Sequence, residues 1–348
     1  MSTKKVPLSF KPKQLTKKLL QNLQDRSRYV VSNRFGLDGD GERRTLDSIG
    51  QEYKITRERV RQIENFALNA IRKSSSFQEA KGVFEEISTL LHSLGGIVEE
   101  KHLLSQASSD RLTQNHVHLY LVLGDQFSKI KDDEHFKTHW VVDHETGDLV
   151  KKILKDIHES IGQGDLISEN EILQKILGHE SAAKIKTEHK TNEAARRWLE
   201  LSNKIAPNPL GEWGQADSSA VKTRGVKDYA YLVMRKHGSP MHFREVAQSI
   251  EKIFGRKVHT ATCHNELIKD ERFVLVGRGV YALKEWGYKK GVVRDVIADI
   301  LKAEGPLTKE EVIEKVLKER YLKKNTILVN LQNQKHFKKL ADGRYTTK

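Results

Sequence analysis

The chain has 348 residues, with 61 Lys and Arg against 47 Asp and Glu, and its formal net charge is +14. This length predicts two or three domains, or more if they are small. The single cysteine, Cys263, excludes an internal disulfide and a Cys-rich zinc site. No signal-peptide core and no stretch of about 18 apolar residues is present, so we expect a soluble, cytoplasmic protein without membrane contact. The positive charge favours an anionic partner, and nucleic acid is the first candidate.

The first strong pattern runs from residue 45 to residue 73, where two helices are predicted with three or four residues between them. Thr45 and Thr56 each precede an apolar periodic segment and can act as N-caps, because a hydroxyl oxygen accepts a hydrogen bond from a free helical N–H. Apolar residues of the second helix recur on one stripe: Val60, Ile63, Ala67 and Ile71. Two helices joined by such a short turn predict a helix-turn-helix.

The second predicted helix carries a polar face that is separate from this stripe. The residues on that face are Arg57, Glu58, Arg61, Gln62 and Asn65. Arginine can pair with guanine, glutamine can pair with adenine, and glutamate can accept from the cytosine amino group, so this face suits base reading in a major groove. The same residues could instead form local ion pairs on a solvated helix, and periodicity leaves both interpretations open.

Residues 19–73 resemble region four of the primary bacterial sigma factors, the domain that recognises the −35 promoter element. The segments that carry the resemblance are DRSRYVVSNRFGLDG, TLDSIG, TRERVRQIE and ALNAIR. The resemblance implies that bases are contacted by Arg57, Glu58 and Gln62. It implies that the DNA backbone is contacted by Arg26, Arg34, Thr45 and Arg61. It also implies two partners, double-stranded promoter-like DNA and the β flap of the RNA polymerase core.

This segment departs from the family's pattern in three ways. Lys54 stands in the turn where the family usually has Gly, Asn or Asp, and a left-handed conformation there costs a lysine about 1–2 kcal/mol. Phe66 replaces a position that is often basic, which predicts packing rather than a phosphate contact. No segment before Leu19 matches the aromatic-rich region that melts the −10 element, so we expect no promoter opening by this chain alone.

A smaller pattern recurs four times beyond a linker that begins at Ser74. Each copy has an aliphatic helix, a turn with glycine, one or two apolar residues and a second helix, and three copies end in a predicted β-hairpin. We therefore expect a mainly α protein, in which an N-terminal helix-turn-helix is followed by tandem winged-helix units with small β-hairpin wings. The predicted segments are a basic arm (1–18), the sigma-like helix-turn-helix (19–75) and four winged units (79–143, 146–215, 222–288 and 289–348).

The third winged unit, about residues 223–288, resembles the HARE-type helix-turn-helix, a winged domain also found in the delta subunit of RNA polymerase. The segments that carry this resemblance are DYAYLVMRKHGSPMHFREVAQSI, TATCHNELIKD and RFVLVGRGVYALKEWG. Side chains of this unit that could contact DNA phosphates, a minor groove or a protein partner are Arg256, Lys257, His259, His264 and Arg278. The fold alone leaves these alternatives open.

The sequence predicts no catalytic residue, metal site or cofactor, and hence no enzyme. The pair His135 and His139 has i, i+4 spacing, and His116, His118 and His144 are near in sequence, but the pair falls in a predicted wing rather than a helix. Cys263 precedes His264 in a predicted helix, where neighbouring side chains point about 100° apart and pair poorly. The chain contains no standard phosphate-binding glycine loop.

Together these patterns predict a sequence-specific DNA-binding protein of bacterial transcription, acting as a sigma-factor-like regulator associated with RNA polymerase in the cytoplasm. The alternative is an adaptor that docks on RNA polymerase or another partner and binds DNA only non-specifically. A restriction-type enzyme is a third hypothesis with little beyond the HARE resemblance behind it. The DNA target, the sign of regulation, the oligomeric state and the winged units that touch DNA stay open.

Overall fold

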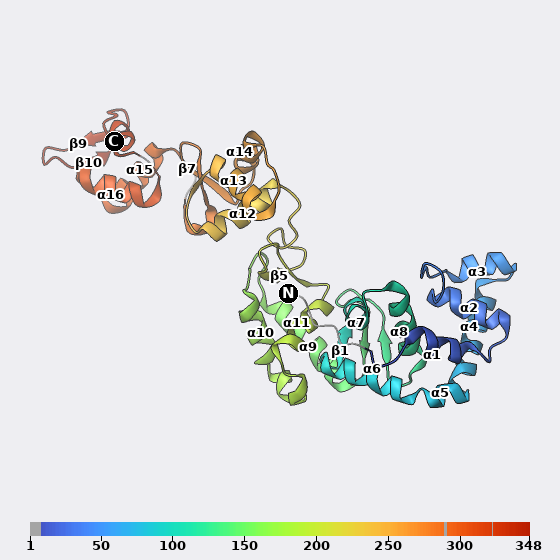
Figure 1. The fold of residues 1–348 in the computed structure, drawn as a ribbon. Helices are drawn as coiled ribbons and strands as arrows, with labels where there is room; N and C mark the ends of the chain where they lie inside the picture. Colours follow the sequence, from blue (N-terminus) through green and yellow to red (C-terminus); the bar gives the residue numbers. More distant parts are fainter. Residues whose placement is uncertain (1–7, 289–290, 322) are drawn as a thin grey trace. The chain divides into compact units, whose positions relative to one another are not determined.

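The computed structural model describes residues 8–288, 291–321 and 323–348. The fold is mainly α with small antiparallel sheets, as predicted (Figure 1). The chain divides into two compact units. Unit 1 comprises Met1–Pro207 and Trp213–Ala216, and unit 2 comprises Asn208–Glu212 and Asp217–Lys348.

Unit 1 begins with the helix-turn-helix segment. Its elements are α1 (Pro12–Leu20), α2 (Asp25–Phe35), α3 (Leu46–Tyr53), α4 (Arg57–Arg72) and the short α5 (Ser75–Glu79). The hydroxyl of Thr45 accepts a hydrogen bond from the Ser48 N–H at 3.1 Å, and that of Thr56 accepts one from the Arg59 N–H at 3.2 Å. Each hydroxyl satisfies an N–H that has no partner within its helix, so both predicted N-caps are confirmed.

The next part of unit 1 has the element order of a winged helix. The elements are α6 (Lys81–Ser93), β1 (Ile97–Glu99), α7 (Glu100–Ala107), α8 (Arg111–Leu123), β2 (Ser128–Ile130) and β3 (His139–Val141). The strands form an antiparallel sheet in the order β1-β3-β2, in which Trp140 is opposite Val98 on one side and Lys129 on the other. The β2–β3 pair is the hairpin that the sequence predicts for residues 127–143.

The last part of unit 1 ends in a smaller hairpin. Its elements are α9 (His144–Ser160), α10 (Glu169–Leu177), the 3₁₀ turns η1 (Glu180–Lys184) and η2 (Thr187–His189), α11 (Asn192–Leu201), β4 (Ile205–Pro207) and β5 (Trp213–Gln215). Strands β4 and β5 pair antiparallel. The sequence pattern is unclear here because Pro207 and Pro209 lack the N–H groups that a strand ladder uses.

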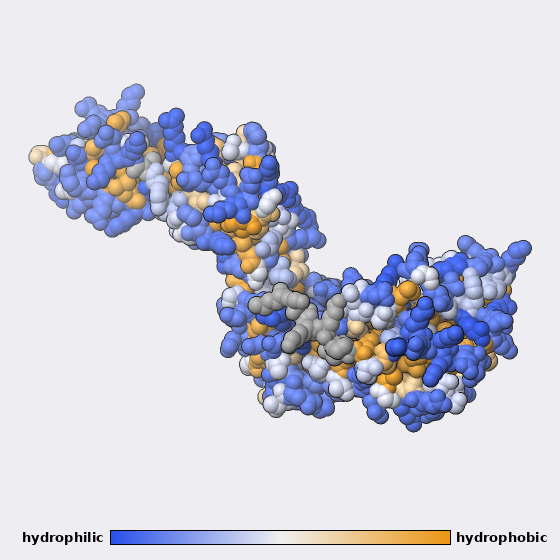
Figure 2. All heavy atoms as spheres, viewed as in Figure 1, coloured by the Kyte–Doolittle hydropathy of each residue, from blue (hydrophilic) through white to orange (hydrophobic). Residues whose placement is uncertain are grey.

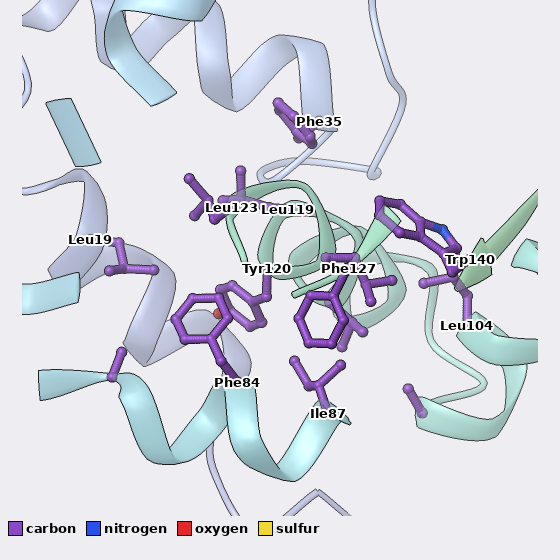
Figure 3. Packing of buried hydrophobic residues seen from close by; sticks show 14 of the residues in the cluster. Leu19, Phe35, Phe84, Ile87, Leu104, Leu119, Tyr120, Leu123, Phe127 and Trp140 are labelled. Carbon is purple, nitrogen blue, oxygen red and sulfur yellow. The ribbon is translucent and has the colours of Figure 1, made fainter. Parts of the chain in front are cut away.

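Helix α8 lies in a core shared by the helix-turn-helix segment and the segment that follows it (Figure 3). Leu119, Tyr120 and Leu123 of α8 are completely buried, and they belong to the same apolar cluster as Leu19 of α1 and Phe84 of α6. The Tyr120 hydroxyl is also within 2.6 Å of the Pro12 carbonyl oxygen, to which it donates. Part of the helix-turn-helix segment, including α1 and the second half of α4, therefore shares its core with the rest of unit 1.

Unit 2 contains the predicted HARE-type segment. Its elements are α12 (Val226–His237), β6 (Met241–His242), α13 (Phe243–Phe254), α14 (Thr260–Lys269), β7 (Phe273–Gly277), β8 (Val280–Leu283) and the 3₁₀ turn η3 (Lys284–Trp286). The strands form a three-stranded antiparallel sheet in the order β6-β8-β7. The predicted wing is thus formed by β7 and β8, and the short strand β6 extends it.

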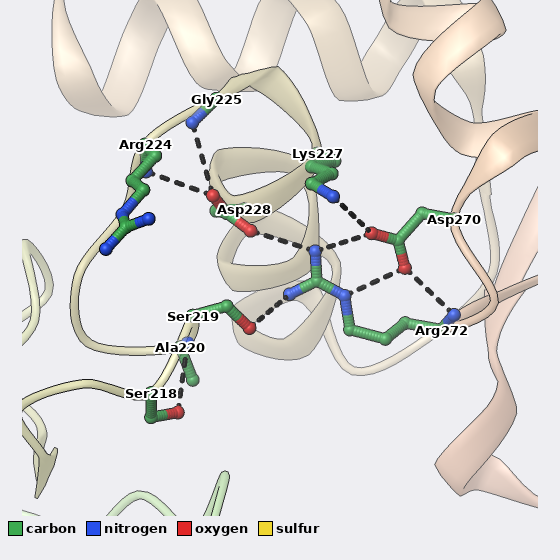
Figure 4. A network of polar contacts seen from close by, with 9 residues as sticks. All are labelled: Ser218, Ser219, Ala220, Arg224, Gly225, Lys227, Asp228, Asp270 and Arg272. Atoms are coloured by element: carbon green, nitrogen blue, oxygen red, sulfur yellow. Dashed lines mark hydrogen bonds and ion pairs between the residues drawn. The ribbon is translucent and has the colours of Figure 1, made fainter.

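A buried ionic network connects the start of α12 to the residue before β7 (Figure 4). Asp228 is only 2% exposed, and its carboxylate lies 2.9 Å from the Arg272 guanidinium and accepts hydrogen bonds from the Arg224 and Gly225 N–H groups. Asp270 also pairs with Arg272, at 2.8 Å. Loss of Arg272 would leave the buried charge of Asp228 without its ionic partner, so this network holds the two elements together.

The C-terminal part of unit 2 has its own small core. Its elements are α15 (Val293–Glu304), α16 (Lys309–Glu319), α17 (Lys324–Leu331), β9 (Phe337–Lys339) and β10 (Tyr345–Thr347). Ile297, Val312 and Ile327 are buried together between the three helices. Strands β9 and β10 pair antiparallel and form the hairpin that the sequence predicts at the end of the chain.

Hydrophilic side chains cover most of the face of each unit that Figure 2 shows. Among the described residues of the helix-turn-helix segment, Phe66 is the large apolar side chain that stays exposed, at 67%. No helix in the described part of the chain has both the length and the apolar character needed to cross a bilayer.

Candidate nucleic-acid interface

The turn between α3 and α4 sets the angle between the two helices. The Ile55 N–H donates to the Gly50 carbonyl oxygen at 2.9 Å, and a Cβ on Gly50 would lie only 2.7 Å from the Ile55 oxygen. A side chain at residue 50 would therefore push the turn open. Lys54 adopts φ 52° and ψ 42°, so the left-handed position that the sequence indicates in this turn is occupied by a lysine.

The inward face of α4 is the predicted apolar stripe. Val60 is completely buried in a small core with Val30 of α2 and Ile49 of α3. Farther along the helix, Ala67 and Ile71 are buried in the core that contains α8. Because one side of α4 is fixed along its length, its opposite side points to solvent in a defined orientation.

The outward face of α4 brings together the three predicted base-contacting residues, Arg57, Glu58 and Gln62, on its first two turns, and all three are exposed. Arg61 binds Glu58 through two hydrogen bonds of 2.9 and 2.8 Å, and Arg59 donates to the Gln62 side-chain oxygen at 3.0 Å. The hydrogen bond from Arg61 lowers the pKa of Glu58, so this carboxylate is charged at neutral pH. Glu58 and Gln62 are thus each paired with a neighbouring arginine of α4 in the free chain.

The predicted backbone contacts occupy different environments. The Arg26 guanidinium lies 5.3 Å from the centroid of the Tyr53 ring and stays exposed, as does Arg61. Arg34 is more enclosed, because it donates to the Arg44 carbonyl oxygen at 2.6 Å and pairs with Glu64 of α4 at 3.3 Å. Arg34 therefore braces α2 against α4 in the free chain. Thr45, also exposed, uses its hydroxyl oxygen for the α3 cap.

Two further arginines contribute to this surface without having been identified from the sequence. Arg44 lies 2.5 Å from Glu52 and 2.9 Å from the Tyr29 hydroxyl, and it connects the loop before α3 to the end of that helix. The hydrogen bonds from Tyr29 and Arg44 lower the pKa of Glu52. Arg59 could have been found from its i, i+3 spacing to Gln62, whereas no helical spacing connects Arg44 to Glu52 or Tyr29.

The loop between α2 and α3 is anchored by Asn115 of α8. The Asn115 side-chain amide donates to the carbonyl oxygens of Gly36 and Gly41, both at 2.8 Å, and its oxygen accepts from Arg43 at 2.8 Å. Asn115 is 3% exposed, so water does not satisfy these groups. On the other side of the segment, Arg72 donates to the carbonyl oxygens of Val122 and Leu123. Helix α8 therefore supports the helix-turn-helix segment at two places, the α2–α3 loop and the end of α4.

Unit 2 offers a second set of basic side chains around α14 and the wing. Lys257 and His259 are exposed just before α14, and Arg278 is exposed in the β7–β8 turn. The His264 ring instead stacks on Phe243, with ring centroids 4.3 Å apart. Cys263 is completely buried, and burial raises the pKa of its thiol to about 11, which opposes the thiolate needed for nucleophilic chemistry.

Comparisons with known families assign both segments to classes of DNA-binding domain. Residues 19–73 match the family model of Sigma-70, region 4. Residues 224–286 match the HARE-HTH family model, a helix-turn-helix domain whose name refers to ASXL and restriction endonuclease proteins. The chain thus combines a sigma region 4 segment in unit 1 with a HARE-type segment in unit 2, as the resemblances predicted.

Individual relatives match over the first of these segments. RNA polymerase sigma factor SigA of Clostridium acetobutylicum is 47% identical over 64 residues, which are 18% of this chain and 17% of the relative. RNA polymerase sigma factor SigA of Listeria monocytogenes is 45% identical over 67 residues, which are 19% of this chain and 18% of the relative. The match spans less than a fifth of either relative. It supports a DNA-binding role related to transcription.

Proposed function

We propose that this protein binds duplex DNA in a sequence-specific manner during bacterial transcription, and that its sigma-like segment reads a −35-type element. The observation that carries the proposal is the exposed first two turns of α4, where Arg57, Glu58 and Gln62 face solvent together. A helix of this kind enters a major groove with its N-terminal residues near the base edges. The N-terminus of α4 also favours a nearby phosphate.

Base reading requires the local pairs on α4 to open. Exposed pairs such as Glu58–Arg61 contribute little to stability, because water competes for both charges. A good bidentate contact with a base discriminates by about 1–3 kcal/mol. The contact with DNA therefore outweighs the local pair. Once Arg61 is released, it can contact a phosphate while Glu58 accepts from a cytosine amino group.

The HARE-type segment is proposed to add a second contact with DNA or with a partner. Lys257 and His259 lie just before α14 and Arg278 lies in the β7–β8 turn, next to the helix and the wing that winged helices present to DNA, and all three are exposed. Association with the RNA polymerase core, through its β flap, is also part of the proposal. Its support is the sigma region 4 match together with the SigA relatives, which are RNA polymerase sigma factors.

A second candidate function is an adaptor that uses the same segment to bind protein. Phe66 favours this candidate, because it is 67% exposed on α4 one turn beyond Gln62. An exposed aromatic side chain beside an arginine-rich surface is typical of residues that anchor protein interfaces. In this case DNA binding would be weak, salt-sensitive and independent of sequence.

Selection of bound sequences from a random duplex pool tests the proposal. The full chain at near-physiological salt should enrich a short motif similar to a −35 element. The Arg57→Ala/Gln62→Ala double variant should lose the motif but keep non-specific binding. The matched control is Gln174→Ala/Arg294→Ala, which removes the same side-chain types from exposed positions on α10 and α15. A motif that survives the Arg57 and Gln62 changes would overturn the assignment, and a pool without any motif would favour the adaptor.

A further inference from the structure

Three side chains with metal-binding donors meet where α6 contacts η2 in unit 1. His92 lies in the last turn of α6, and Glu188 and His189 lie in η2. One donor atom from each side chain lies within 4.8 Å of the other two. Imidazole nitrogens and a carboxylate oxygen are a ligand set that zinc accepts.

The buried ring of His189 provides independent support for a ligand. His189 is 1% exposed, and neither of its ring nitrogens makes a hydrogen bond of normal geometry, although the His92 backbone interacts weakly with the ring. Nδ1 of His92 is also buried without a hydrogen-bond partner. A buried polar atom left in this state costs about 1–3 kcal/mol, and folded proteins satisfy most such atoms. The two rings are stacked nearly parallel, with centroids 5.5 Å apart. A rotation of the half-buried His92 ring is therefore needed before both rings can bind one ion.

The spacing of the donor atoms is suited to a small cation. Nε2 of His189 is 3.7 Å from the nearer Glu188 oxygen, which is too long for a hydrogen bond. Zinc bonds of about 2.0–2.2 Å in a tetrahedral arrangement place ligand atoms roughly 3.3–3.5 Å apart. A small rotation of the exposed Glu188 side chain therefore brings its oxygen to a coordinating position.

We propose that His92, Glu188 and His189 bind one zinc-class divalent ion, with water in the remaining position. The ion joins α6 to η2 and so connects the two winged-helix-like parts of unit 1. This site differs from the histidines considered in the sequence, because those contact other groups. His116 contacts Thr16, His139 contacts the Lys137 carbonyl oxygen, and His144 contacts Ser128.

Zinc titration of the untagged full chain tests this site. After removal of metals with EDTA, the chain should take one equivalent of Zn²⁺ from a chromophoric chelator. Zinc should also raise the midpoint of thermal unfolding, because an ion that binds the folded chain stabilises it. His92→Gln and Glu188→Gln should each weaken zinc binding about 10-fold or more and remove most of the thermal shift.

The matched control is His135→Gln, the same replacement at a half-buried histidine of the β2–β3 wing. It should bind zinc like the original chain. Glu188 is exposed, so Glu188→Gln keeps the fold and separates loss of a ligand from misfolding. Absence of zinc binding at micromolar concentrations would overturn the proposal. Equal binding by the original chain and the His92→Gln/Glu188→Gln double variant would also overturn it, since the ion would then lie elsewhere.

Discussion

Lys54 holds the helix-turn-helix turn in a conformation that is unfavourable for its residue type. Among the described residues, Lys54 alone combines a side chain with a positive φ, and that side chain is exposed. The cost arises from the Cβ, which crowds the carbonyl oxygen in the left-handed region. We expect Lys54→Gly to raise the free energy of unfolding by about 1 kcal/mol, because relief of this strain exceeds the added entropy of glycine in the unfolded chain.

The matched control for this change is Lys54→Ala, which removes the charge and the long side chain but keeps the Cβ. Urea unfolding of both variants would separate the two effects. The strain explanation requires a gain for glycine and almost none for alanine. Equal stability of the two variants would show that the turn relaxes around any residue at this position.

Glu100, the first residue of α7, has a strongly perturbed pKa. Burial alone would raise this pKa, but hydrogen bonds and charge from His118 and Lys129 outweigh burial and lower it to about 2. Lys129 lies 2.6 Å from the carboxylate, and the Trp140 indole N–H donates to it at 2.9 Å. We take Lys129 as the charged partner, because burial lowers the pKa of His118 and keeps that ring neutral at pH 7.

This depressed pKa predicts a specific loss of stability in acid. The carboxylate stabilises the folded chain fully above its unfolded pKa of about 4.5, and this contribution disappears as pH falls toward 2. A shift of this size corresponds to roughly 3 kcal/mol. Urea unfolding at pH 6 and pH 3 should show a larger acid loss for the original chain than for Glu100→Gln. Parallel losses would contradict the assigned role of Glu100.

At the scale of elements, Asn115 connects α8 to the loop that leads into α3. Its buried side chain donates hydrogen bonds to two carbonyl oxygens and accepts one from a guanidinium N–H. We expect Asn115→Ala to reduce the free energy of unfolding by about 2–4 kcal/mol, because the remaining polar groups lose their partner.

Asn325→Ala is the control for this change, because Asn325 is an exposed helical asparagine of α17 and its replacement should alter stability by at most about 0.5 kcal/mol. Hydrogen exchange can locate the effect. Amides of residues 36–44 and of α3 should lose protection first in Asn115→Ala, since the anchor of their loop is gone. Uniform loss of protection throughout unit 1 would contradict a local anchoring role.

The elements of the helix-turn-helix could be predicted from the sequence because their signals are local. Thr45 and Thr56 precede the apolar periods that they cap, and Val60, Ala67 and Ile71 repeat at helical spacing. The packing of α8 against these helices could not be predicted in the same way. The second half of α8 is apolar at nearly every position, so its periodicity does not indicate that it packs against α1, α2 and α6.

In the candidate sites, too, local spacing could be predicted from the sequence, whereas contacts between distant segments could not. Sequence spacing placed Arg57, Glu58 and Gln62 on one face of α4, and the structure has them there. Arg34 is different, because its pair with Glu64 joins two helices and has no sequence period. The cluster of His92 and His189 was also missed, since its members come from elements that are far apart in the sequence.

At the scale of the whole molecule, each of the two units contains one segment that matches a DNA-binding family. The chain also carries a net charge of +14. When one unit is bound, the other is held near the same duplex by the chain, so its contact becomes effectively intramolecular. Even a weak contact of unit 2 with phosphates would then increase the affinity of the full chain.

The salt dependence of binding can show whether unit 2 makes this contact. The slope of log K against log salt rises by about 0.9 for each phosphate contact. On a long duplex that carries the selected motif, Lys257→Ala/Arg278→Ala should reduce the slope by about 1–2, because two proposed contacts are lost. On a duplex that covers only the motif the slope should not change, since unit 2 then has no DNA to reach. Arg26→Ala should lower both slopes by about 1.

Arg294→Ala is the control for charge, because it removes an exposed arginine from the same unit as Lys257 and Arg278. It should leave both slopes unchanged if specific contacts, rather than net charge, determine them. Suppose instead that Lys257→Ala/Arg278→Ala alters neither slope while Arg26→Ala alters both. Unit 1 would then provide the DNA contact alone, and the exposed basic residues of the HARE-type segment would be available for a protein partner.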